Sequence, residues 1–250
     1  MRRRATLLLF CLVATLVDSR PAPAEEIRVA VAANFEPTAR ALADAFEARS
    51  GHRVVLSSAS SGSLYAQIRN GAPFDLFLSA DADRPRRLTR EGAAAGKARL
   101  YAIGRLVWWA PRQRGDAARC RRRLLRAKRL AMANPQTAPY GLAAAQTLKK
   151  LAINPAYLKI VTGENIGQTY AYVASGAVEG GFVAASQLVR SHESRGCRWP
   201  VPASLHPPLE QGAVLLRRGG GKPAARAFFR YLFSAEARQL IRDSGYELPP

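Results

Sequence analysis

The sequence predicts an α/β protein in which a mostly parallel β-sheet is flanked by helices. Two observations carry this prediction. Short apolar runs typical of buried strands alternate with longer segments whose apolar residues recur every three or four positions, as in amphipathic helices. Repeated β-α-β units of this length build parallel sheets with helices on both faces.

The first half of the chain shows this alternation most clearly. A buried strand is predicted at residues 27–32, and a helix follows Asn34 and runs to about Ser50. Gly51 is a typical residue for the end of that helix. The further elements predicted here are strands at 54–58 and 75–78, a helix at 64–70, and a helix that starts near Asp81 and Asp83.

The second half of the chain repeats the scheme. The predicted strands lie at residues 105–110, 129–133, 158–161, 181–184 and 211–216, and the predicted helices at 141–151, 167–175, 223–232 and 234–244. Residues 191–208 are rich in Pro, Ser and charge, so we predict a linker that returns to the first half.

The N-terminus has the pattern of a secretory signal peptide. Three arginines follow Met1, an apolar run covers residues 5–17, and Ala22-Pro23-Ala24 forms an A-x-A cleavage site. We therefore predict that residues 1–24 are removed and that the protein is periplasmic. Removing 24 of the 250 residues leaves 226, enough for one large domain or two lobes.

The mature chain is strongly basic. Residues 25–250 contain 34 Lys and Arg against 17 Asp and Glu, a net charge of +17. Export argues against nucleic acid as the partner. Two interpretations remain open: an arginine-rich composition on a solvated surface, and long-range attraction of an anionic ligand or an anionic membrane.

The cysteines and the catalytic motifs point away from an enzyme. Cys120 and Cys197 remain after cleavage, which permits one disulfide in an oxidising compartment and suggests no catalytic role. The sequence has no G-x-S-x-G, H-E-x-x-H or C-x-x-C motif. The histidines (His52, His192 and His206) are isolated, and Gly219-Gly220-Gly221-Lys222 is predicted to be a turn rather than a phosphate loop.

Four strand-to-helix junctions are the candidate site. They contain Asn34, Ser60-Ser61-Gly62-Ser63, Pro139-Tyr140-Gly141 and Asn165-Ile166-Gly167, two junctions in each half of the chain. In parallel α/β sheets such junctions share one edge, where ligands bind, and each helix start is an anion site. Ordinary helix capping by Ser and Asn is the alternative for any one junction.

The chemical groups at these junctions limit the class of ligand that could bind. They supply the Asn34 amide, the Ser61 and Tyr140 hydroxyls and backbone N–H groups, with no carboxylate, Arg or Lys. Phosphate keeps a proton near neutral pH and benefits from an acceptor, whereas sulfate, molybdate and tungstate need donors only. This reasoning predicts a buried dianion but does not separate sulfate from molybdate.

The same residues resemble the molybdate-binding proteins of bacterial ABC importers. The most specific stretches are residues 29–35, 59–64 and 71–81, and the resemblance covers the mature chain. It implies a two-lobed, type II periplasmic-binding-protein fold with the ligand in the interlobe cleft. The implied lobes are residues 25–104 plus 206–250 and residues 105–205, with a hinge near Gly104 and Pro208.

The resemblance also implies the site and the partners. Asn34 and Ser61 would bind the oxyanion from the first lobe, Tyr140 and Ile166 from the second, Ile166 through its backbone N–H. Ala33 and Gly62 are additional candidates, although Ala33 replaces a hydroxyl residue of some relatives. One branch of the family has its binding tyrosine where Ala184 stands, and this chain resembles the other branch, with tyrosine at position 140.

The implied function is that of a solute carrier. The protein is expected to be a monomer that captures molybdate, and also tungstate, and delivers it to an ABC permease in the inner membrane. Molybdenum enters only as the bound oxyanion, without direct protein ligands, and no cofactor is needed. The alternatives are a carrier of another oxyanion such as sulfate, and an exported enzyme using Ser61 and Asp81.

Overall fold

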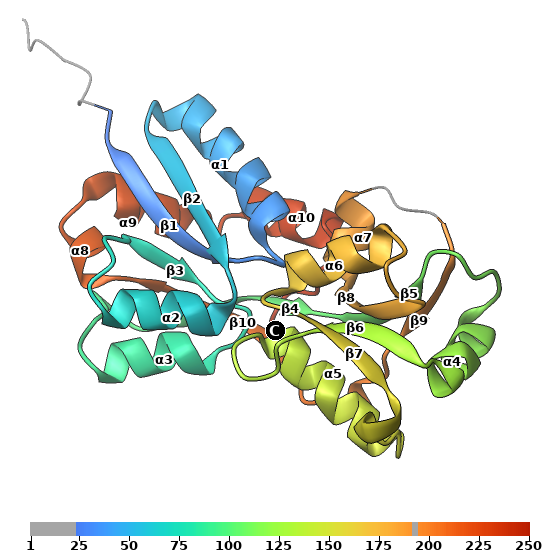
Figure 1. Ribbon diagram of the computed structural model, residues 1–250. Coiled ribbons are helices and arrows are strands. Elements are labelled where there is room, and N and C mark those ends of the chain that lie inside the picture. Colours follow the sequence, from blue (N-terminus) through green and yellow to red (C-terminus); the bar gives the residue numbers. More distant parts are fainter. Residues whose placement is uncertain (1–23, 192–194) are drawn as a thin grey trace, which may run out of the picture.

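Two five-stranded sheets, each covered by helices on both faces, lie side by side in the computed structural model of the protein (Figure 1). The structure describes residues 24–191 and 195–250. The predicted signal peptide, apart from Ala24, and His192 therefore lie outside the described residues. No helix of the described chain has the length and apolar character needed to cross a bilayer.

The first sheet has the strand order β2-β1-β3-β10-β4. Its strands are β1 (Glu26–Ala32), β2 (Arg53–Ala59), β3 (Leu76–Leu78), β4 (Arg99–Gly104) and β10 (Leu209–Leu215). β1 is parallel to β2 and β3, whereas β10 is antiparallel to its neighbours β3 and β4. Four of the five strands thus run in one direction, and only β10 opposes them.

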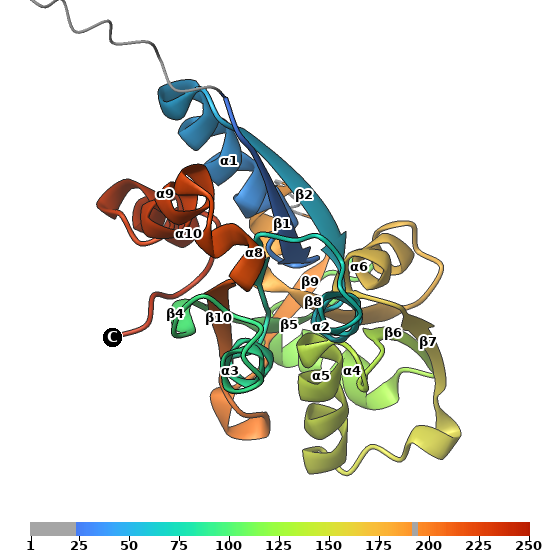
Figure 2. The same cartoon turned by 90° about the vertical axis from the view of Figure 1, so that its left-hand side faces the viewer.

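Helices cover both faces of this sheet. One face packs against α1 (Glu36–Ser50), α9 (Pro223–Tyr231) and α10 (Ala235–Asp243), and the other against α2 (Ser61–Arg69) and α3 (Asp83–Arg90). Figure 2 shows α1, α9 and α10 together on one side of β1 and β2, away from α2. Phe35, Phe46 and Phe228 are in the core of the first face, and Leu64 and Phe77 in that of the second.

The second sheet has the strand order β7-β6-β8-β5-β9. Its strands are β5 (Leu106–Ala110), β6 (Arg129–Ala133), β7 (Lys159–Gly163), β8 (Gly180–Ala184) and β9 (Cys197–Pro200). Only β5 runs against the others, since it is antiparallel to β8 and β9. One face packs against α4 (Ala117–Arg126) and α5 (Pro139–Lys150), the other against α6 (Ile166–Ala174) and α7 (Ala185–Arg190).

The predicted α/β class with mostly parallel sheets is confirmed. The chain passes to the second sheet between β4 and β5 and returns between β9 and β10. The domain boundaries, 25–104 with 206–250 and 105–205, remain a prediction.

Three parts of the sequence prediction are corrected. Residues 191–208 are not simply a linker, because they contain β9, which pairs with β5, and a 3₁₀ turn at Ala203–Leu205. Gly219 and Gly220 belong to a short helix, α8 (Arg217–Gly220), not to a turn. β4, α4 and α7 were not predicted; the buried residues of α4 are only Cys120 and Leu124, too few for a clear helical stripe.

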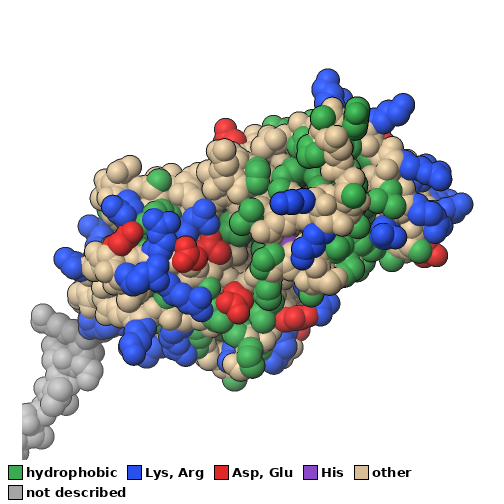
Figure 3. Space-filling model, turned by 90° about the horizontal axis from the view of Figure 1, so that it is seen from below, with side chains coloured by type: hydrophobic (Ala, Val, Ile, Leu, Met, Phe, Trp, Pro, Cys, Tyr) green, Lys and Arg blue, Asp and Glu red, His purple; other side chains and the backbone are tan. Residues whose placement is uncertain are grey.

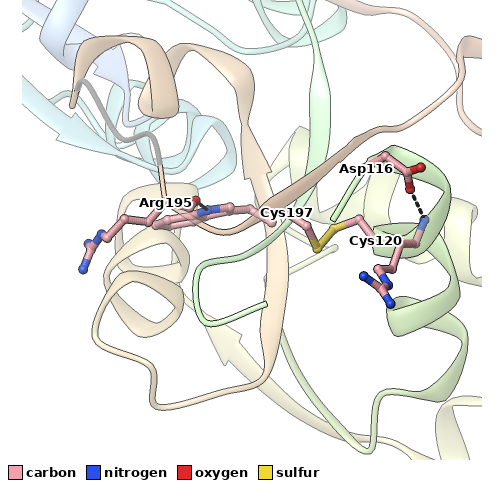
Figure 4. The surroundings of a disulfide bond; sticks show 6 residues. Asp116, Cys120, Arg195 and Cys197 are labelled. Carbon is pink, nitrogen blue, oxygen red and sulfur yellow. Dashed lines mark hydrogen bonds between the residues drawn. A yellow bond between two sulfur atoms is a disulfide. The ribbon is translucent and has the colours of Figure 1, made fainter. Parts of the chain in front are cut away.

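A disulfide joins Cys120 of α4 to Cys197 of β9 (Figure 4). The two Cα atoms lie 5.5 Å apart, and both side chains are buried. The bond links residues 77 positions apart and ties the edge strand β9 to α4. The disulfide that the cysteine count permitted is thus confirmed.

Three helices begin earlier than predicted, so the candidate residues Ser61, Tyr140 and Ile166 lie in the first turns of these helices. α2 starts at Ser61 because the Ser60 hydroxyl accepts a hydrogen bond from the Ser63 N–H and caps the helix. α5 starts at Pro139, where proline suits the first turn, and α6 starts at Ile166 behind the Asn165 cap.

Candidate anion-binding site

A small pocket lies between the two sheets, where the starts of α2, α5 and α6 meet the segment between β1 and α1. It is lined by Ala32, Ala33, Asn34, Ala59, Ser60, Ser61, Ala80, Ala138, Pro139, Tyr140, Asn165 and Ile166. Its volume is about 10 Å³ after allowance for the radius of a water molecule. Pockets for organic ligands are typically several hundred Å³, so this one suits a single small ion.

No lining residue of the pocket has a charged side chain, so any attraction for an anion must come from backbone dipoles. Within the described chain, the backbone N–H groups of Asn34, Ser61, Tyr140 and Ile166 have no protein acceptor. The last three are the first or second residues of α2, α5 and α6, where the helix dipole is positive. No group of three acidic, His or Cys side chains in the described chain could hold a metal ion.

Ser61 is placed to donate from both its backbone and its side chain. It is almost completely buried, and its hydroxyl oxygen accepts a hydrogen bond of 2.9 Å from the Ala80 N–H. This bond uses the oxygen as an acceptor and leaves the hydroxyl hydrogen for a partner in the pocket.

The Asn34 side chain points away from the pocket, which differs from the sequence expectation. Its amide donates two hydrogen bonds of 3.0 Å, one to Gln211 Oε1 and one to the Tyr246 hydroxyl. Both amide hydrogens are therefore used inside the protein. Asn34 offers the pocket its backbone N–H instead of the predicted side-chain donor.

The Tyr140 hydroxyl is also directed behind the pocket. It accepts a hydrogen bond of 3.3 Å from Gln211 Nε2, and a side chain on Gly104 would collide with it. The Tyr140 N–H, in the first turn of α5, has no protein acceptor in the described chain. The predicted residue is thus at the pocket, but its ring reaches the crossover between the sheets.

Asn34 and Tyr140 belong to one buried network, which we call the hinge network. Its members are Asn34, Tyr101, Tyr140, Ser186, Gln211 and Tyr246. Gln211 of β10 connects Asn34 and Tyr101 of the first sheet to Tyr140 of the second. Ser186 of α7 donates to the Asn34 carbonyl oxygen at 3.3 Å, a second link between the two sheets.

Burial raises the pKa of all three tyrosine hydroxyls in this network well above the usual value of 10.0. These phenols therefore remain neutral at physiological pH and add no negative charge beside an anion site.

The two additional candidates, Ala33 and Gly62, do not supply donors. The Ala33 N–H donates to the Ala59 carbonyl at 3.0 Å, and the Gly62 N–H to the Thr137 carbonyl at 2.8 Å. The second bond crosses between the two sheets. A Cβ atom at Gly62 would lie 2.9 Å from the Thr137 Cα and carbonyl oxygen, so the close approach depends on glycine.

Sequence reasoning missed most of the hinge network. Gln211 offered a usable clue, because it is the polar residue at the start of an otherwise apolar predicted strand, residues 211–216. Tyr246 follows the last helix and showed no pattern. The Ser61–Asp81 pair considered for an enzyme is not assembled, since the Asp81 carboxylate binds Arg84 through its backbone N–H and its guanidinium.

Comparison with known proteins identifies the family. The model of the family described as bacterial extracellular solute-binding protein matches residues 27–247. The chain belongs to this family. This solute-binding protein is similar to the molybdate-binding protein ModA of Azotobacter vinelandii, with 42% identity over 233 residues, 91% of this chain and 92% of that protein. It is 40% identical over 230 residues to ModA of Rhodobacter capsulatus, with 90% of each chain covered.

A solved structure supports the same relationship for this solute-binding protein. The periplasmic molybdate-binding protein of Azotobacter vinelandii matches with a TM-score of 0.83 and 37% identity, covering 90% of this chain and 100% of that one. The likeness confirms the two-lobed α/β fold expected from the sequence.

Proposed function

We propose that this solute-binding protein captures molybdate and delivers it to an ABC permease, without chemical change to the ion. The observation that carries the proposal is the pocket at which Asn34 and the starts of α2, α5 and α6 have backbone N–H groups without a protein acceptor in the described chain. Similarity to two molybdate-binding proteins at 40% identity or more supports molybdate as the ligand. Tungstate, which has the same charge and tetrahedral shape, is the second proposed ligand.

The donor set favours an oxyanion that carries no proton. The lining residues include no carboxylate that could accept a hydrogen bond from a protonated phosphate. Neutral N–H and O–H donors bind a dianion well in a site with little water, because the local dielectric is low. Sulfate meets the same description, so it remains the rival ligand.

We assign the contacts with the oxyanion as follows. Ser61 donates through its hydroxyl and N–H, and Asn34, Tyr140 and Ile166 donate through their backbone N–H groups. The Asn34 and Tyr140 side chains act indirectly, by holding these backbone segments through Gln211. Signal-peptide cleavage after Ala24 would place this carrier in the periplasm, with the two lobes pivoting near Gly104 and Pro208.

Isothermal titration of the processed chain tests the ligand. We expect saturable one-to-one heat with molybdate and with tungstate, and none with phosphate. Sulfate is the decisive comparison: equal heats and affinities for sulfate and molybdate would contradict the proposal and identify a general oxyanion carrier.

The Gly62→Ala variant tests whether the observed approach of the two lobes is the ligand-bound arrangement. The added methyl group meets the Thr137 backbone, and overpacking of this kind costs about 1–3 kcal/mol. If closure accompanies binding, the Kd for molybdate should rise by about 5- to 150-fold while the ligand-free melting temperature stays unchanged. Gly96→Ala is the matched control, because a Cβ atom there meets nothing within 4 Å. An unchanged Kd for Gly62→Ala would refute closure at this contact.

A further inference from the structure

Helix α4 and its flanking residues carry a dense group of positive charges. Residues 112–129 contain nine basic residues and a single acidic one, Asp116. The basic residues are Arg112, Arg114, Arg119, Arg121, Arg122, Arg123, Arg126, Lys128 and Arg129, and all nine are exposed. In the described part of the chain, none of them takes part in an ion pair. Within the described residues, salt bridges thus leave their charge unneutralised.

Four of these arginines form one continuous stripe on α4. Arg119, Arg122, Arg123 and Arg126 are spaced at i, i+3, i+4 and i+7, which places them on one face of the helix. Together they line a surface hollow of about 290 Å³, and no other described residue lines it. Leu125, which lies next to the stripe in sequence, is 43% exposed.

The opposite face of α4 is firmly attached to the protein. Cys120 and Leu124 are buried, and the disulfide connects Cys120 to β9 (Figure 4). The arginine stripe therefore lies on the exposed face of a helix whose buried face is fixed to the second sheet. Figure 3 shows Lys and Arg side chains at the end of the molecule that carries α4 as well as at the opposite end.

The distribution of charge separates the two interpretations that the composition left open. Residues 105–205 hold 16 Lys and Arg against 4 Asp and Glu, a net charge of +12. The rest of the mature chain holds 18 against 13, a net charge of +5. If the charge reflected only an arginine-rich composition, residues 105–205 and the rest of the mature chain would have similar net charges for their length. The charge also lies away from the anion pocket, whose lining includes no residue of α4.

We propose that the α4 face is a docking surface for anionic phospholipid bilayers. An open stripe of guanidinium groups can pair with several separate phosphates of a membrane surface, whereas it does not enclose any one ion. A half-exposed leucine beside the stripe can enter the headgroup layer, as in other basic amphipathic helices. Such docking would hold the carrier near membrane-bound partners. This inference does not depend on which oxyanion the pocket binds.

Co-sedimentation with vesicles tests the docking surface. The processed chain, residues 25–250, contains every described helix and strand and is mixed with vesicles of phosphatidylcholine, with or without phosphatidylglycerol. We expect binding only to the vesicles that contain phosphatidylglycerol, and a steep loss of binding with added salt. Equal binding to both vesicles would overturn the proposal.

A charge-neutralised variant locates the surface. Each basic residue near an anionic bilayer increases partitioning onto the bilayer roughly five-fold. A variant without the four stripe arginines should therefore partition roughly several-hundred-fold more weakly. It carries Arg119→Gln, Arg122→Gln, Arg123→Gln and Arg126→Gln. The matched control is Arg40→Gln, Arg53→Gln, Arg230→Gln and Arg238→Gln, which removes the same charge from exposed positions of the other part of the chain. The control should partition like the unsubstituted chain. If both variants lost vesicle binding equally, net charge alone would explain the binding, and a localised docking surface would be refuted.

Two further measurements keep the test decisive. Melting temperature and molybdate titration should be unchanged in the α4 variant. If that variant does not fold, Leu125→Trp serves instead: its fluorescence should shift to the blue with anionic vesicles, and no shift would overturn the proposal. Polyglutamate that binds the chain as tightly as the vesicles do would also overturn it, in favour of an acidic protein partner.

Discussion

The double variant Ser61→Ala, Ile166→Pro is expected to weaken molybdate binding by about 10²- to 10⁴-fold. A hydrogen bond to a charged group contributes about 1.5–3 kcal/mol, and each substitution removes one such donor, the first from α2 and the second from α6. The donors come from different lobes but would contact the same ion in one small pocket, so their effects are expected to be coupled rather than strictly additive. Each single variant should weaken binding by about 10- to 150-fold, and the double variant should bind more weakly than either.

Ile166→Pro is a clean way to delete a backbone donor. Ile166 is the first residue of α6, a position that proline occupies readily, and Asn165 before it has φ −146° and ψ 175°, which proline tolerates. The Ile166 carbonyl, which accepts from Gln187, is retained. Ile166→Val is the matched control, because it shortens the side chain but keeps the N–H group.

Titration calorimetry and thermal unfolding separate binding from folding in this series. Ser61→Ala also removes the acceptor of the buried Ala80 N–H, which should lower the ligand-free stability by about 1–3 kcal/mol. Ile166→Pro also removes part of a buried core side chain and should lower the ligand-free stability by about 1–2 kcal/mol, of which Ile166→Val reports a part. If Ile166→Pro binds molybdate as tightly as Ile166→Val, the N–H of Ile166 does not contact the ion and our assignment of the second lobe fails.

The protein is expected to lose stability steeply above pH 10. Burial raises the pKa of Tyr101, Tyr140 and Tyr246 above the ordinary value of 10.0, so the folded protein keeps these protons while the unfolded chain loses them. Each such tyrosine lowers the free energy of unfolding by about 1.4 kcal/mol per pH unit, or about 4 kcal/mol per unit for the three. Their contribution is complete below pH 10 and is lost as the pH rises toward the folded-state pKa values.

Urea unfolding at pH 9, 10 and 11 measures this slope. Tyr101→Phe should remove about one third of it, whatever its effect on stability at pH 9. Tyr157→Phe is the control, because Tyr157 is 84% exposed and should leave the slope intact. A free energy of unfolding that is the same at pH 9 and pH 11 would show that the hinge network is open to solvent and does not hold its tyrosines neutral.

The local pattern of the sequence accounts for most of the fold. The alternation of strands and helices, the apolar stripe of α1 and the capping serine of α2 are properties of short segments, and the structure confirms them. β9 and α4 escaped prediction because they are stabilised by partners distant in sequence. β9 pairs with β5 and is joined by the disulfide to α4, whose own apolar stripe is too short to predict a helix.

The sequence by itself determined which junctions could hold an anion, since small residues and helix starts are local features. Only the tertiary structure decided which donors at these junctions already have partners within the protein. The Asn34 amide is a donor in isolation, but in the fold Gln211, 177 positions away, accepts one of its hydrogens; Gln211 also donates to the Tyr140 hydroxyl oxygen, 71 positions away, and so uses that oxygen as an acceptor. A side chain's free hydrogens depend on what the fold brings beside it, and no local pattern contains that information.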